Sequence, residues 1–274
     1  MVARTANPSD WQRFSELATS EKWLVPDAER RMFSSLWAKQ ALALVDEERF
    51  CGMVTAVVHE RSGWIGNLIV PVPLRNRGYG TQLFQEALSI LQKQQVSSIW
   101  LTASESGRPL YERFGFRPVQ QVERWILRGD KNQAPGDIAV QAASQSLIYE
   151  ADLAVWKEQR NLFLGVLVEE GTVLGDTESV ALLQQGQHMQ VIGPWYSKND
   201  CPRTYRRLLQ QILVAAKCQA RDLVIDVCAA SALRSLLAAA GFARCGSTTL
   251  MVQGSRQDVA LHEMVSLASL GSIG

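Results

Sequence analysis

Arg75-Asn76-Arg77-Gly78-Tyr79-Gly80 lies between an apolar run, Trp64 to Val70, and an amphipathic run, Thr81 to Gln94. Two glycines separated by one residue, between a strand pattern and a helix pattern, allow a loop so tight that its backbone N–H groups can point at an anion. The two arginines add positive charge to this loop. The order of strand, glycine loop and helix therefore predicts a phosphate-binding turn.

Strand and helix patterns continue on both sides of the loop and predict an α/β fold, of the α+β kind. After the loop, one apolar stripe recurs at helical spacing and predicts a buried helix face: Leu83, Phe84, Ala87, Leu88 and Leu91. Further helices are expected over 8–18, 26–36 and 108–114. Strands are expected over 40–45, 50–60, 64–70, 98–103 and 123–127.

The second half of the sequence repeats the first. Ile192-Gly193 and Gly241-Phe242 are separated by almost the same distance as Ile65-Gly66 and Gly115-Phe116, with a loop, a helix and a strand between them in both halves. Turn-forming and charged residues over 128–136 predict a linker. We therefore expect two domains, 1–130 and 137–274, each a mixed, mostly antiparallel sheet flanked by helices.

The two halves differ where the phosphate-binding turn is predicted. The second loop, Asp200 to Arg206, contains no glycine, and Leu237 falls near the position equivalent to Tyr111. Only the first half is therefore expected to bind a phosphate group. The stretch 257–270 shows a weak helical pattern and is expected to pack back on the body of the protein.

Composition excludes several other classes of protein. The 274 residues carry a formal net charge of +1 and no basic run, so nucleic acid is not expected as a partner. No segment has the ~20 uncharged apolar residues that span a bilayer, so we expect no membrane association and a cytoplasmic protein. The five cysteines are scattered, and their spacing indicates neither a disulfide framework nor a metal site.

Two motifs resemble those of a known family. The stretch Val70 to Gly80 resembles the acyl-CoA signature of the GNAT superfamily of N-acetyltransferases, R/Q-x-x-G-x-G/A after a strand, and Gly107 to Phe116 resembles the second hallmark of that family. The whole chain resembles a bacterial subgroup in which a GNAT domain precedes a degenerate GNAT-like domain. This resemblance implies acetyl-CoA as co-substrate. A dinucleotide site is excluded, because G-x-G-x-x-G would need a glycine in place of Leu83.

The resemblance and the physics of the loop assign the site residues. The amides of Arg77 to Thr81 should hold the coenzyme A phosphates, because a helix N-terminus offers free N–H donors and a partial positive charge. The resemblance implies that the strand ending at Ile69-Val70 splays from its neighbour, and that Tyr111 gives a proton to the departing thiolate. Residues expected to bind coenzyme A are Ile69, Val70, Arg75, Asn76, Arg77, Gly78, Tyr79, Gly80, Thr81 and Ser104. At Ser104, many family members have an asparagine.

The base that receives the proton of the acceptor amine is not assigned by the sequence. The strand from Trp64 to Val70 has no carboxylate, and the nearest candidates are Glu105, His59 and Glu60. Aromatic and apolar residues between the first two expected helices favour an apolar or aromatic amine as acceptor: Trp23, Met32 and Phe33.

The leading hypothesis is an acetyl-CoA-dependent N-acyltransferase. It would transfer acetyl to the primary amine of a small molecule by direct attack while both substrates are bound. Two alternatives remain at this point: a non-catalytic acyl-CoA sensor, and an N-acetyltransferase acting on proteins or peptides. The oligomeric state, including a homodimer, is left open.

Overall fold

A computed structural model describes residues 1–129, 141–216, 221–228, 231–255 and 258–274. They form two compact units. Unit 1 comprises Met1–Pro118, Leu250–Arg256 and Leu270–Gly274, and unit 2 comprises Val119–Thr249 and Gln257–Ser269. Most of the linker expected over 128–136 lies outside the described residues. The domain limits at 130 and 137 stay a prediction.

Unit 1 contains the elements that its sequence pattern predicts, within a few residues. Its elements are β1 (Val2–Thr5), α1 (Pro8–Ser20), α2 (Asp27–Ser34), η1 (Ala38–Gln40), β2 (Ala41–Asp46), β3 (Arg49–Val58), β4 (Ser62–Ile69), η2 (Val72–Leu74), α3 (Tyr79–Lys93), β5 (Ser98–Ala103) and α4 (Arg108–Arg113). Local signals explain several boundaries. Asn7 and Asp10 form a capping box at the start of α1.

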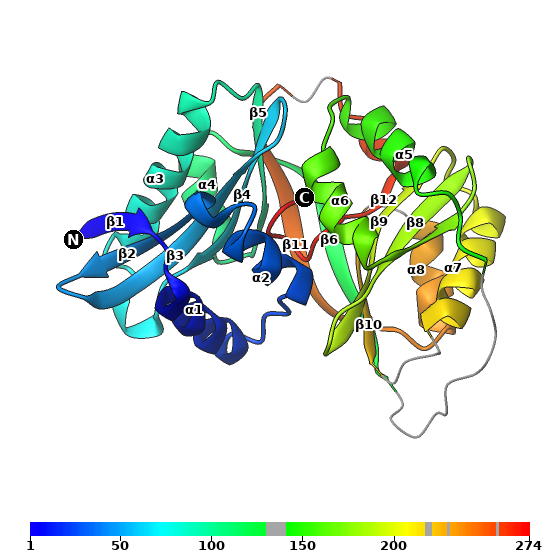
Figure 1. The fold of residues 1–274 in the computed structure, drawn as a ribbon, viewed down its shortest axis with the longest axis horizontal. Helices are drawn as coiled ribbons and strands as arrows, with labels where there is room; N and C mark the ends of the chain where they lie inside the picture. Colours follow the sequence, from blue (N-terminus) through cyan, green and yellow to red (C-terminus); the bar gives the residue numbers. More distant parts are fainter. Residues whose placement is uncertain (130–140, 217–220, 229–230, 256–257) are drawn as a thin grey trace. The chain divides into compact units, whose positions relative to one another are not determined.

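The sheet of unit 1 follows the order β1-β2-β3-β4-β5 and is completed by the end of β11 (Ala243–Gly254). Successive strands pair antiparallel, except for the parallel pair β4 and β5. Helices α3 and α4 cover one face, and α1 and α2 cover the other (Figure 1). The predicted apolar stripe of α3 is buried in the first of these cores.

Unit 2 repeats this order of elements, as the sequence predicted. Its elements are β6 (Arg117–Leu127), α5 (Ser146–Trp156), α6 (Asn161–Glu169), β7 (Thr172–Gly175), β8 (Ser179–Gln184), β9 (Met189–Ser197), α7 (Pro202–Ala216), β10 (Asp222–Cys228), α8 (Ser231–Ala239), η3 (Leu261–Glu263) and β12 (Met264–Ser266), with most of β11. Helices α7 and α8 pack on one face of its sheet, and α5 and α6 lie on the other (Figure 1).

The positions of two strands in the sheet could not be predicted from local sequence patterns. Strand β6 pairs antiparallel with β10 of unit 2, for example Ile126 with Val224. The last residues of β11, Leu250–Gly254, belong to unit 1 and are neighbours of β5. The strand expected over 123–127 therefore exists, and it contributes to the sheet of unit 2.

The helical pattern expected over 257–270 is wrong. Apart from the single turn η3, the described part of this stretch contains a strand, β12, which pairs with both β9 and β10. Strands β9 and β10 pair directly with each other from Met189 and Asp222 as far as Ile192 and Ile225. Beyond that point, β12 lies between them. Backbone groups freed where two strands diverge need new hydrogen-bond partners, and β12 supplies them.

Candidate functional site

The glycine loop of unit 1 is anchored at its start by Arg75. The Arg75 Nε donates to the Val70 carbonyl at 3.0 Å, and Arg75 Nη2 pairs with Glu21 Oε1 at 2.6 Å. This guanidinium therefore joins the end of β4 to the end of α1. Arg75 was expected to bind coenzyme A, and its described contacts are structural; the cofactor role stays a prediction. Asn76 and Arg77 are exposed in the loop.

The N-terminus of α3 is open to an anion. Gly78 is the N-cap residue with φ of 87°, a left-handed conformation in which glycine carries no Cβ penalty. No side chain caps this helix, and its first turn contains no acidic residue. A Cβ on Gly78 would meet nothing within 4 Å, and one on Gly80 would meet only Val70 Cγ2, at 3.8 Å. Free N–H groups, helix dipole and open space thus coincide at Tyr79, Gly80 and Thr81.

Strands β4 and β5 diverge next to this loop. They pair in parallel over Ser62–Trp64 and Ser98–Trp100, whereas β4 continues to Ile69 and β5 to Ala103. On its other side, β4 carries a bulge opposite β3, between Gly66 and Ile69, where Asn67 has φ of 53°. A bulge bends the strand and re-aims its backbone groups. The expected splay at Ile69-Val70 therefore matches the geometry of these strands.

Tyr111 and Ser104 meet at Gly107. A Cβ on Gly107 would lie 3.2 Å from Ser104 Oγ and 3.6 Å from the Tyr111 hydroxyl. The Ser104 Oγ accepts from Gly107 N at 3.1 Å. The sequence motif contains Gly107, but the sequence did not reveal why a glycine is needed there: a side chain at this position would crowd these two groups.

Tyr111 has a buried ring, and its hydroxyl has no hydrogen-bond partner among the described residues. The residue is 9% exposed, and its ring packs against Phe84 and Phe116 with centroid distances of 5.0 and 6.4 Å. Within the described part of the chain, no residue forms a hydrogen bond with this hydroxyl. Burial raises the pKa of Tyr111 to about 12. The group therefore remains protonated at neutral pH.

The remaining sequence candidates lie in less specific surroundings. Glu105 and Glu60 are exposed, and His59 contacts the Ile273 carbonyl at 3.3 Å. None is placed beside Tyr111 by a described contact, so the base stays unassigned. Met32 and Phe33 are buried, and Phe33 stacks on Trp11 at 5.4 Å. These apolar residues thus form core, and the apolar or aromatic acceptor stays a prediction.

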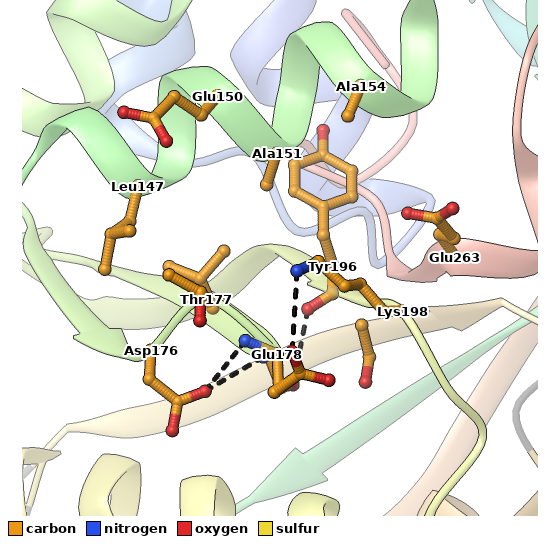
Figure 2. A pocket seen from close by; sticks show the side chains of 13 residues that line it. Leu147, Glu150, Ala151, Ala154, Asp176, Thr177, Glu178, Tyr196, Lys198 and Glu263 are labelled. Atoms are coloured by element: carbon orange, nitrogen blue, oxygen red, sulfur yellow. Dashed lines mark hydrogen bonds and ion pairs between the residues drawn. The ribbon is translucent and has the colours of Figure 1, made fainter.

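Unit 2 contains a cavity of a different character. A cavity of about 260 Å³ lies between α5 and the turn that joins β7 to β8 (Figure 2). Four of its lining residues are acidic, and one is basic: Glu150, Asp176, Glu178, Glu263 and Lys198. Asp176 forms an ion pair with Arg207, and Glu178 with Lys198. A predominantly acidic wall repels phosphate groups, so this cavity is not a second coenzyme A site.

Unit 2 also lacks the other parts of the site. Leu237 occupies the place of Tyr111, because Phe242 N donates to the Leu237 carbonyl as Phe116 N donates to the Tyr111 carbonyl, at 3.0 and 3.2 Å. The opening between β9 and β10 is filled by β12. In place of the glycine loop is Asp200–Arg206.

Sequence reasoning missed one segment at the site. Residues Leu270–Gly274 belong to unit 1 and lie against Gly66 of β4. A glycine inside a strand is a sign of close backbone approach, and Gly66 was the available signal. Which segment approaches it could not be read from the sequence, because more than two hundred positions of chain separate the two.

Comparison with known proteins agrees with this geometry. Residues 9–116 match the family model of the Acetyltransferase (GNAT) family. The crystal structure of a candidate acetyltransferase from Pyrococcus horikoshii superposes with a TM-score of 0.79 at 19% identity, over 99% of this chain and 95% of that chain. A GCN5-related N-acetyltransferase from Sphaerobacter thermophilus gives a TM-score of 0.65 at 18% identity, over 92% and 95%. Identities this low show the fold. No curated protein matches the sequence.

The family match spans the glycine loop, the diverging strands and Tyr111. Within the described ranges, no helix is both long and apolar enough to cross a bilayer. The same ranges contain no group of three or more side chains suited to a metal ion. Residues 9–116 thus form a domain that matches the Acetyltransferase (GNAT) family.

Proposed function

We propose that this protein transfers an acetyl group from acetyl-CoA to the primary amine of a small molecule, with both substrates bound at the same time. The observation that carries the proposal is the Tyr111 hydroxyl, which has no hydrogen-bond partner in the described chain and lies near Ser104 at Gly107. A hydroxyl at the tip of a buried ring that no protein group binds is free to bind a ligand or to take part in a reaction.

The open N-terminus of α3 supports the coenzyme A part of the proposal. The amides from Arg77 to Thr81 would hold the phosphates, and the exposed Arg77 would add charge. Backbone groups of Ile69 and Val70, at the end of the diverging strand, would hold the pantetheine arm. Ser104 would make part of the contact that an asparagine makes elsewhere in the family.

In the proposed reaction, Tyr111 donates one proton. Acetyl-CoA supplies the activated acetyl group. As the amine nitrogen bonds to the acetyl carbon and the carbon–sulfur bond breaks, Tyr111 gives its proton to the departing sulfur. The proton lost by the amine passes to solvent water, and Tyr111 is reprotonated from solvent, so the acid is restored. A thiol with pKa near 8.5 leaves as thiolate at pH 7 at a cost of only about 2 kcal/mol, so the acid has a modest task. Freeing an amine of pKa near 10.4 costs roughly 4 to 5 kcal/mol, which makes the amine proton the larger demand.

A panel of amines tests the proposal. Amino acids, polyamines, aminoglycosides and lysine peptides are each mixed with acetyl-CoA, and release of free thiol is followed. We expect amine-dependent release with a small-molecule amine, and one bound acetyl-CoA per chain by titration calorimetry. Release with lysine peptides alone would favour transfer to proteins instead.

One observation favours a second function, a non-catalytic acyl-CoA sensor. Strand β4 carries no carboxylate, and no base is placed beside Tyr111. Binding of acetyl-CoA without thiol release for any amine of the panel would favour the sensor over the enzyme.

A further inference from the structure

One face of β4 is covered by the last five residues of the chain. Alternate residues of a strand point to opposite faces, and Ile65 belongs to the core that also contains Leu83 and Tyr111. Trp64 and Gly66 therefore point to the face away from α3. The segment Leu270–Gly274 lies on that face, within unit 1.

Both diverging strands bind the same carbonyl of this segment. Trp64 Nε1 donates to the Gly271 carbonyl at 3.3 Å, and Thr102 Oγ1 donates to it at 3.2 Å. Trp64 is the last residue of β4 that pairs with β5, and Thr102 lies beyond Trp100, the last residue of β5 that pairs with β4. The segment therefore crosses the opening at the point where the strands separate.

Close contact with Gly66 fixes the position of Ser272. A Cβ on Gly66 would lie 2.6 Å from Ser272 Cα and 2.9 Å from its carbonyl carbon. These are backbone atoms, which cannot turn aside as a flexible side chain can. Glycine weakens a strand, so its presence here fits a position where another main chain must come close.

A buried carboxylate holds the segment from its other side. Glu29 of α2 is 4% exposed, accepts a hydrogen bond from Ser272 Oγ, and accepts from Leu270 N at 3.4 Å. Ile273, next in the chain, is fully buried. A carboxylate is kept in such surroundings only when hydrogen-bond donors satisfy it. The segment is thus a fixed part of the structure rather than a loose end.

Resting on the proposed acetyl transfer, we propose that Leu270–Gly274 is the acceptor-side wall of the transfer site. Tyr111 and α3 occupy one face of β4, so the amine must approach from the opposite face, where Ser272 lies against Gly66. Ser272 is then a specificity-determining residue, and Glu29 is a positioning residue that acts through it. A substituent next to the amine nitrogen would have to pass the main chain of Ser272, so this wall would select unhindered primary amines over branched ones.

Four variants test this wall at saturating acetyl-CoA. Ser272→Ala removes one hydroxyl, and Glu29→Ala removes the group that holds it. Glu29→Gln keeps one oxygen that can accept from Leu270 N, and its amide NH2 can donate to the Ser272 hydroxyl, so both contacts can be kept. Glu16→Ala, the same change at an exposed carboxylate of α1, is the matched control. For each variant, KM and kcat are measured with linear and branched amines, the Kd of acetyl-CoA by calorimetry, and folding by thermal unfolding.

We expect Ser272→Ala and Glu29→Ala to raise the KM for the best linear amine about tenfold. In both variants, kcat/KM for branched amines should rise relative to kcat/KM for linear amines. Glu29→Gln and Glu16→Ala should stay close to the wild type, and the Kd of acetyl-CoA should stay within about twofold throughout. A general loss of fold would instead lower kcat and acetyl-CoA binding together. Ser272→Ala is the variant least able to cause such a loss.

Any of three results would contradict the proposal that Leu270–Gly274 forms the acceptor-side wall. The first is unchanged KM and unchanged amine preference in both alanine variants, and the second is a Glu29→Gln variant as impaired as Glu29→Ala. The third is a rise in the Kd of acetyl-CoA large enough to account for the loss of activity. An active wild type with one of these results contradicts this inference alone. A wild type inactive toward every amine contradicts the proposed function, and this inference with it.

Discussion

At the scale of single residues, the catalytic role of Tyr111 can be tested separately from its role in packing. Its ring packs against Phe84, while its hydroxyl has no partner in the described chain. Tyr111→Phe keeps the packing and removes the proton donor, so we expect turnover to fall roughly 10²-fold with little change in acetyl-CoA affinity. Stability should change by less than about 1 kcal/mol, because no hydrogen bond within the described protein is lost with the hydroxyl.

The control for this variant is Tyr149→Phe, the same change at a half-buried tyrosine of α5 in unit 2. Steady-state thiol release and thermal unfolding give both readouts. If Tyr111→Phe turned over as fast as the wild type, the tyrosine would have no catalytic role. If it unfolded at a markedly lower temperature, the hydroxyl would have a structural partner instead.

The pKa of the same tyrosine predicts the pH dependence of turnover. Burial raises the pKa of Tyr111 to about 12, so the acid stays protonated across the usual assay range. The acceptor amine has an ordinary pKa near ~10.4 and gains reactive free base as pH rises. Turnover at saturating acetyl-CoA should therefore rise from pH 6 to pH 9 without a decline. A decline above pH 8 that Tyr111→Phe abolishes would mean that the tyrosine titrates much lower.

At the scale of elements, the start of α3 allows binding and stability to be separated. Gly80 lies in the first turn of the helix, and a Cβ there would meet only Val70 Cγ2, at 3.8 Å. Gly80→Ala should stabilise the fold by about 0.5–1 kcal/mol, since alanine is the better helix former. The added methyl group would stand where a phosphate must approach, so we expect the Kd of acetyl-CoA to rise about tenfold or more.

Gly165→Ala is the matched control for the helix effect. Gly165 lies inside α6 of unit 2, and a Cβ there would meet only the Tyr149 hydroxyl, at 3.8 Å. It should give a similar gain in stability with unchanged acetyl-CoA binding. Calorimetric titration and denaturant unfolding of the two variants decide the matter: equal acetyl-CoA affinity in both would mean that the phosphates do not lie at Gly80.

Elements defined by local pattern could be predicted, and those defined by distant pairing could not. The stripe from Leu83 to Leu91 and the hairpin of β2 and β3 follow from side-chain spacing and turn residues over a few positions. The glycine loop was found in the same way, and Tyr111 was found because Gly107 to Phe116 resembles a motif of a known family. In contrast, β12 is a strand because β9 and β10 leave backbone groups to be paired, and Ser272 reaches Gly66 from the far end of the chain. No local window contains that information.

At the scale of the whole molecule, the duplicated fold has diverged at the same place in each unit. Gly66 of β4 and Gly193 of β9 are each approached closely by a later segment, through Ser272 and Leu267. In unit 2 that later part of the chain includes β12, which inserts between β9 and β10 and takes up the freed backbone groups. In unit 1 the segment crosses one face, bound by side chains, and the backbone at the end of β4 is left for a ligand.

This difference predicts one acetyl-CoA per chain. Unit 2 has β12 in the opening, no glycine between Asp200 and Arg206, and Leu237 in the place of Tyr111. Pairing with β12 makes backbone hydrogen bonds that a pantetheine arm would have to replace. Titration calorimetry should give a stoichiometry of one, and Gly80→Ala should weaken that single event. A second event that survives Gly80→Ala would show that unit 2 binds the cofactor, and that filling by β12 is reversible.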